Sequence, residues 1–157
     1  MLQIRGASRS AAFARDVATV LVFVAAGFSA MASANAAPGD REVDELTAFQ
    51  SPSGNVGCQL SPTGVRCDID QRDWSPPPRP ADCRLDYGQG ISLGAGKQAH
   101  LVCAGDTART GSAEPLAYGA AITAGPIRCE STEAGMTCRD TGSGHGFSIS
   151  REAYRLF

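Results

Sequence analysis

Two segments of the chain, each enclosed by a pair of cysteines, match one another residue class by residue class. Eight residues separate Cys58 from Cys67, and eight separate Cys129 from Cys138. Each segment has a glycine four residues before its first cysteine and a branched aliphatic residue two before it. Each also places a glycine and an apolar residue shortly before its second cysteine. This repeat predicts two copies of one local structure.

The first copy fits a β-hairpin, because side chains alternate between the two faces of a strand. If Ser61 to Gly64 form a four-residue loop, the facing pairs on one side are Val56 with Ile69, Cys58 with Cys67, and Leu60 with Val65. The polar residues Asn55, Gln59, Arg66 and Asp68 then fall on the other side. Pro62 suits the second position of a type I turn, and Gly64 can take the positive φ that follows.

The second copy gives the same register with fewer apolar residues. Its facing pairs are Ile127 with Asp140, Cys129 with Cys138, and Ser131 with Met136. We expect this thinner hairpin to pack at the edge of its sheet.

All six cysteines follow residue 57, and six cysteines allow fifteen pairings. The repeat favours Cys58–Cys67 and Cys129–Cys138, which leaves Cys83–Cys103. The alternative is a zinc site, whose ligands usually include cysteines two to four residues apart. No such close pair occurs in the sequence.

The N-terminal residues 1–36 are typical of a signal peptide. Three arginines precede an uncharged apolar run over 17–28, and Ala34-Asn35-Ala36 offers a cleavage site. An uncleaved membrane anchor is the alternative, but a spanning helix needs about 20 apolar residues. We therefore expect an exported protein, extracellular or in the cell envelope, in which disulfides form.

After a charged, flexible lead-in over 37–45, we expect one domain over 46–157. Short strands separated by glycine and proline favour an all-β fold, either a small antiparallel sandwich or a barrel, with the two hairpins related by a pseudo-twofold axis. A short helical turn is predicted over Ser150 to Tyr154, with Ser150 as its cap. Prolines 76, 77, 78 and 80 favour an extended surface segment.

The charge argues against a nucleic-acid partner. The net charge is −2, and removal of three arginines and Asp16 with the signal peptide makes it about −4. No sequence motif indicates a cofactor.

His145, in a glycine-rich context, is the candidate for catalysis, with Asp106 and Ser143 as conceivable triad partners. No Gly-x-Ser-x-Gly elbow accompanies it, and most histidines are ordinary polar or packing residues. His100, in a predicted strand, has a weaker case.

Two further groups of residues, three aspartates and a run of glycines, are better explained by structural roles than by ligand binding. Asp68, Asp70 and Asp73 resemble a calcium loop only superficially, because the required glycine and distal glutamate are misplaced; we interpret them as solvated carboxylates. The glycines over 88–96 lack the strand-to-helix setting of a phosphate loop and are interpreted as turn residues.

Trp74, beside the proline-rich segment, is the other candidate surface contact. An exposed tryptophan can anchor a protein partner. Alternatively, it folds back over the small core, as a lone tryptophan usually does.

Three phrases carry a resemblance to a known group of proteins: Phe49-Gln-Ser-Pro-Ser-Gly-Asn-Val-Gly-Cys58, Gly135-Met-Thr-Cys138 and Gly144-His-Gly-Phe-Ser-Ile-Ser-Arg151. From Phe49 onward the chain resembles a family of small exported, cysteine-containing actinobacterial proteins of the mycobacterial type. That family has no assigned function, so the resemblance implies an origin and a location and transfers no catalytic residue.

The sequence favours a non-enzymatic binding module that contacts an unknown protein or envelope component. The alternatives are a small extracellular hydrolase using His145 and a secreted inhibitor of hydrolases.

Overall fold

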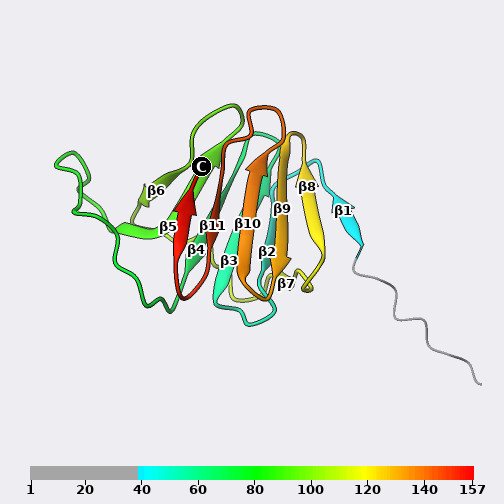
Figure 1. The fold of residues 1–157 in the computed structure, drawn as a ribbon, viewed down its shortest axis with the longest axis horizontal. Coiled ribbons are helices and arrows are strands. Elements are labelled where there is room, and N and C mark those ends of the chain that lie inside the picture. Colours follow the sequence, from blue (N-terminus) through cyan, green and yellow to red (C-terminus); the bar gives the residue numbers. More distant parts are fainter. Residues whose placement is uncertain (1–38) are drawn as a thin grey trace, which may run out of the picture. The chain divides into compact units, whose positions relative to one another are not determined.

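The computed structural model describes residues 39–157, so the predicted signal peptide lies outside the described part. These residues form twelve strands and no helix, arranged in two six-stranded sheets. Nothing in this described range is a helix long and apolar enough to cross a membrane. Figure 1 shows the sheets as separate layers, with β8, β9 and β10 overlapping β2, β3 and β4 in the view.

One sheet has the order β1-β8-β9-β10-β11-β12. Its strands are β1 (Asp40–Glu42), β8 (Ala121–Ala124), β9 (Ile127–Thr132), β10 (Gly135–Asp140), β11 (Gly146–Ile149) and β12 (Tyr154–Leu156). The other has the order β6-β5-β4-β3-β2-β7. Its strands are β2 (Thr47–Gln50), β3 (Val56–Ser61), β4 (Gly64–Ile69), β5 (Tyr87–Gly94), β6 (His100–Cys103) and β7 (Glu114–Pro115).

The domain is the expected all-β sandwich, although its sheets are mixed where we expected them to be antiparallel. β1 pairs in parallel with β8, and β7 pairs in parallel with β2. After each of these two strands, a short connection takes the chain to the other sheet, where the next strand begins. The two consecutive strands therefore cannot pair as a hairpin. β1 also lies within the lead-in that we expected to be flexible, and Arg128 holds its Asp40 at 2.8 Å.

Both hairpins have the predicted register. Cys58 pairs with Cys67 and Cys129 with Cys138, each flanked by the expected neighbours. The first loop is shorter than predicted, because Ser61 and Gly64 themselves pair and leave a two-residue turn. Gly64 is needed for space rather than for a positive φ: a Cβ there would lie 2.6 Å from the Leu93 carbonyl oxygen.

The second hairpin does not lie at a sheet edge, which corrects our expectation. β9 and β10 are the two central strands of their sheet. The thin apolar face is sufficient because Ile127 and Met136 are fully buried, and because the partner strands β8 and β11 add Ile122, Phe147 and Ile149 to the same core.

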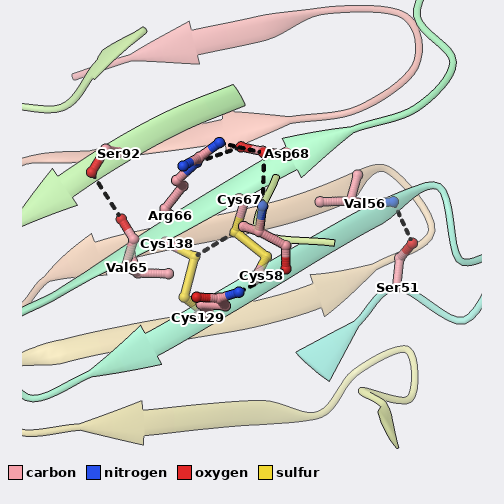
Figure 2. The surroundings of a disulfide bond; sticks show 12 residues. Ser51, Val56, Cys58, Val65, Arg66, Cys67, Asp68, Ser92, Cys129 and Cys138 are labelled. Atoms are coloured by element: carbon pink, nitrogen blue, oxygen red, sulfur yellow. Dashed lines mark hydrogen bonds and ion pairs between the residues drawn. A yellow bond between two sulfur atoms is a disulfide. The ribbon is translucent and has the colours of Figure 1, made fainter. Parts of the chain in front are cut away.

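The three disulfides join Cys58 to Cys67, Cys83 to Cys103 and Cys129 to Cys138, the pairs that the sequence predicts. The two hairpin disulfides are fully buried and meet between the sheets, with 3.9 Å between the Sγ atoms of Cys67 and Cys138 (Figure 2). Because bonded sulfurs carry no proton, this is a van der Waals contact.

The two sheets are built on one plan. Each consists of a parallel edge strand followed by a five-strand meander, so β7-β2-β3-β4-β5-β6 corresponds to β1-β8-β9-β10-β11-β12. The chain is thus a tandem repeat of six strands, β1 to β6 and β7 to β12, in which the first strand of each repeat joins the sheet of the other. This exchange ties the two layers together.

The helical turn predicted over 150–154 is wrong. Ser150 N–H donates to the Ala153 carbonyl, and the Ser150 hydroxyl accepts a hydrogen bond from Ala153 N–H at 3.3 Å, which closes a tight turn between β11 and β12. Tyr154 is extended because it pairs with Ile149 and packs on Trp74. The Ser150 hydroxyl therefore makes a local hydrogen bond like that of a helix cap, but the pairing of β12 with β11 keeps the residues that follow extended.

Candidate functional site

A polar groove of about 500 Å³ lies at one end of the sandwich, where turns from both sheets meet. The lining includes four residues between β2 and β3 (Ser51, Ser53, Gly54 and Asn55), residues 70–71 after β4, and residues 150–152 between β11 and β12. Glu133 contributes from the β9–β10 turn, and Arg109 and Tyr118 come from the segments flanking β7. The groove is therefore assembled from parts of the chain that are distant in sequence.

The β2–β3 turn is held by a compact set of hydrogen bonds. The buried Ser51 hydroxyl accepts from Val56 N–H at 3.1 Å and lies 3.1 Å from the Ser53 hydroxyl. Gly54 has a φ of 71° and donates its N–H to the Ser51 carbonyl. Asn55 pairs with the Gln71 backbone, donating at 2.9 Å and accepting at 2.8 Å. These bonds fix the wall of the groove.

Arg109 forms part of the rim and depends on a glycine beneath it. A Cβ at Gly57 would lie 2.8 Å from Arg109 Cγ, so the arginine stem lies directly on the β3 backbone. Its guanidinium Nη1 is then 2.8 Å from Asp70 Oδ1. The stem is held by packing, and the charged end faces the groove with its partner.

A second ion pair lies at the groove, where Arg151 belongs to the lining. Arg151 Nε is 3.3 Å from Asp73 Oδ2, and both side chains are more than half exposed. Beside them, hydrogen bonds from the Glu152 backbone N–H and the Ser150 hydroxyl lower the pKa of the Glu152 carboxyl. The groove therefore carries charges of both signs, and both of its arginines are paired with an aspartate.

The repeat provides an internal comparison, because the symmetry-related end of the sandwich is closed. There the β8–β9 turn has two residues, 125–126, where the β2–β3 turn has five. A Cβ at Gly125 would lie 3.3 Å from Pro62, so the turns of the two sheets touch. Asp140 closes the same end by accepting a hydrogen bond from Gly96 N–H. The groove is thus a departure from the common plan of the two repeats.

The three aspartates interpreted above as solvated each pair with a different arginine. Asp70 and Asp73 join the rim pairs just described. Asp68 is only 1% exposed, which corrects our interpretation. Arg66 donates to both its carboxylate oxygens at 2.9 and 2.8 Å, and Ala108 N–H donates to Oδ2 at 2.9 Å (Figure 2 shows the Arg66 contacts). Asp68 therefore anchors the loop after β6 to the outer face of β4.

His145 is partly buried just before β11, next to Gln98, Ala99, Leu156 and Phe157. The conceivable triad is not brought together. The Asp106 carboxylate pairs with Arg66 at 2.7 Å on the other sheet. The Ser143 hydroxyl accepts a hydrogen bond from the His145 backbone N–H at 3.3 Å. His100 is exposed on β6.

Trp74 is partly buried against the core and is not a protruding anchor. Its indole N–H donates to the Ser150 carbonyl at 2.9 Å, and its ring lies 4.5 Å from that of Tyr154. The Arg72 guanidinium also lies over the Trp74 ring, 4.6 Å from its centroid. Trp74 thus ties the proline-rich segment to the β11–β12 turn behind the groove.

The groove residues Tyr118, Arg109, Glu133 and Arg151 were missed by the sequence analysis, which singled out Trp74 and His145. One signal was available. When the two repeats are aligned on their cysteines, the turn before Val56 is longer than the turn before Ile127. The longer turn is the one that lines the groove.

Neither the curated proteins nor the solved structures include a match to this chain. Residues 26–157 match the family described as a family of unknown function, DUF6636. Because the match covers most of the sequence, the chain belongs to the DUF6636 family.

Proposed function

We propose that this protein is an exported, non-enzymatic binding module of the cell envelope, and that its binding site is the groove between the turns of the two sheets. The observation that carries the proposal is the contrast between the two ends of the sandwich. Equivalent turns are in contact at one end, whereas at the other a longer β2–β3 turn and two arginines, each paired with an aspartate, line a groove of about 500 Å³. A volume of this size is within the range of ligand sites.

Export is supported by three disulfides and by the signal-like residues 1–36. Disulfides persist in oxidising compartments and are rare in the cytosol. The actinobacterial origin rests on the sequence resemblance alone and remains part of the proposal.

A binding role has more support than catalysis. Arg109, Asp70 and Arg151 are engaged in ion pairs and the Glu152 carboxyl in local hydrogen bonds, and no histidine or cysteine is among the described residues that line the groove. A general acid or base needs a group poised to exchange a proton with the substrate. His145 is not among the residues that line the groove. Among the described residues, no hydrogen bond joins its ring nitrogens to Asp106 or to a serine hydroxyl.

The proposal is tested by retention of the purified, exported protein on the isolated cell envelope of the producing organism. Arg151→Ala removes one exposed rim charge, and because exposed ion pairs contribute little stability the variant should fold normally. We expect it to lower retention at least about fivefold. Arg139→Ala, at an exposed position on β10, is the matched control and should bind like the wild type.

Equal retention of both variants, or no retention of the wild type, would overturn the proposal. Loss of the activity of an added lysozyme or protease in the same assay would instead favour the inhibitor hypothesis.

A further inference from the structure

We infer that the groove takes a neutral, hydroxyl-rich glycan, with the ring of Tyr118 packed against the face of a sugar. This inference deepens the proposed function and rests on it. It follows from the kinds of groups that line the groove, from their state of pairing and from the rigidity of the wall.

The charges of the groove argue against an anionic polymer. Three carboxylates, from Asp70, Glu133 and Glu152, stand with two guanidinium groups, from Arg109 and Arg151. Arg109 pairs with Asp70, and Arg151 pairs with Asp73 just outside. A site for a phosphate-rich polymer gathers unpaired basic groups, and both guanidinium groups of the groove are already paired. Glu133 and Glu152 form no ion pair among the described residues, and their carboxylates can accept hydrogen bonds from the hydroxyl groups of a neutral ligand.

The lining is also unsuited to a lipid chain. Tyr118 is its one large apolar side chain with substantial exposure, at 43%, while Val56 is buried. Hydroxyl and amide groups from Ser51, Ser53, Asn55, Gln71, Thr132 and Ser150 make up much of the remainder. Groove sites for apolar ligands are lined mainly by apolar side chains. Here the polar groups dominate.

These groups match the chemistry of a saccharide. Sugar hydroxyls donate and accept hydrogen bonds, and neighbouring hydroxyls can engage both atoms of one planar carboxylate or guanidinium group. The opposite face of a sugar ring presents C–H groups, which pack on an aromatic ring that has a polar tip for water or for a further hydrogen bond. The groove supplies one such ring among planar polar groups.

The rigidity of the wall is the third element. Each hydrogen bond to a sugar replaces one to water, so its net gain is small. Affinity then depends on groups that need not be ordered upon binding. The hydrogen bonds of Ser51 and Asn55, together with the packing of Arg109 on Gly57, hold the wall in place before any ligand arrives.

The ligand class can be tested without knowing the particular glycan. Periodate cleaves carbon–carbon bonds between neighbouring hydroxyls, oxidising them to aldehydes while periodate is reduced to iodate. Envelope is divided into portions treated with periodate, with protease, or with an organic solvent that extracts lipid. We expect periodate to abolish retention of the wild-type protein, and the other two treatments to leave at least about four fifths of it, because the lining excludes apolar ligands.

Two variants locate the contact. Tyr118→Ala should lower retention at least about tenfold, whereas Tyr118→Phe, which keeps the ring, should stay within about threefold of the wild type. Urea unfolding of each variant verifies that it is folded. Raising the salt from about 0.01 M to about 1 M, which shortens the Debye length from about 30 Å to about 3 Å, should change retention less than about twofold.

The outcomes separate this inference from the proposed function. If retention depends on Arg151 but is destroyed by protease or solvent and survives periodate, the groove binds and the glycan inference is overturned. Loss of retention at high salt overturns it too, in favour of a charged polymer. If retention is independent of the groove variants, both proposals fail.

Discussion

The Sγ atom of Cys67 lies 3.9 Å from the Sγ atom of Cys138, so the disulfides of the two repeats touch across the interface between the sheets. Each disulfide closes one hairpin, and together they occupy the centre of the shared core (Figure 2). The contact makes the two repeats energetically dependent on one another.

This contact predicts that removal of the two hairpin disulfides is not additive. In the chain-entropy model, a ten-residue loop closed by a disulfide contributes about 2.7 kcal/mol. Replacing Cys58 and Cys67 by alanine, or Cys129 and Cys138, should each cost at least that much. The fourfold variant should lose less than the sum by about 0.5–3 kcal/mol, because the contact between the disulfides is counted in both single losses.

Urea unfolding in a stabilising sulfate buffer provides the measurement. The control combines the Cys129/Cys138 pair with the Cys83/Cys103 pair, which lies at the periphery and should add within about 0.5 kcal/mol. If the losses in the free energy of unfolding added equally well in both combined variants, the prediction would be contradicted.

Two glycines at equivalent positions of the repeats predict matching sensitivity to alanine. A Cβ at Gly90 would lie 2.5 Å from the Cys67 carbonyl oxygen, and one at Gly146 would lie 2.5 Å from that of Cys138. Because backbone cannot move aside cheaply, Gly90→Ala and Gly146→Ala should each lower the free energy of unfolding by about 1–3 kcal/mol. Gly105→Ala is the control, since its nearest neighbour would be Leu85 Cδ2 at 3.7 Å. Similar unfolding midpoints for all three variants would refute the argument.

The hairpins could be predicted because their information is local. Alternation of apolar and polar residues around Cys58 and Cys67 fixes which residues face each other, and the repeat transfers that register to Cys129 and Cys138. The exchanged edge strands could not be predicted in this way. β1 is short, fully exposed and charged, and β7 has two residues including a proline, so neither has the apolar alternation of a strand.

The groove and the burial of Asp68 were beyond local reasoning for a different reason. Asp68 falls on the outer face of β4, as its position in the alternation predicts, yet it is covered by a loop whose contact residue, Ala108, is 40 positions away. Groove residues such as Asn55 and Arg151 likewise come from separate turns. Pairwise contacts at such separations leave no periodic pattern in the sequence.

Asp140, which helps to close the sealed end of the sandwich, predicts a specific dependence on pH. Hydrogen bonds from the backbone N–H groups of Gly96, Ser143 and Gly142 lower the pKa of its carboxyl group. The folded-state pKa therefore lies below the unfolded value of about 3.9. The carboxylate contributes stability that is fully present above the unfolded pKa and is lost as the pH falls through the folded pKa.

Asp140→Asn should accordingly unfold at lower urea than the wild type near pH 7, with the two midpoints converging as the pH falls through the folded-state pKa of Asp140 and the wild-type carboxyl group also becomes neutral. Asp44→Asn, in the exposed connection before β2, alters the net charge equally and serves as the control. If the urea midpoints of the wild type and Asp140→Asn differed by the same amount from neutral to acidic pH, the carboxylate charge would not be what the three N–H groups stabilise.

Asp68 connects the stability of the fold to the groove. It accepts hydrogen bonds from two nitrogens of Arg66 and from Ala108 N–H, and the next residue, Arg109, forms the rim. Asp68→Asn removes the charge from a buried, charge-assisted set of hydrogen bonds and should cost about 1–3 kcal/mol in urea unfolding. Because the loop that carries Arg109 is then less firmly held, envelope retention should also fall at a temperature where the variant remains folded. Asp106→Asn affects the same arginine from an 81% exposed side chain and should change neither quantity measurably. If Asp68→Asn lost stability but kept full retention, Arg109 would be positioned by its packing on Gly57 alone.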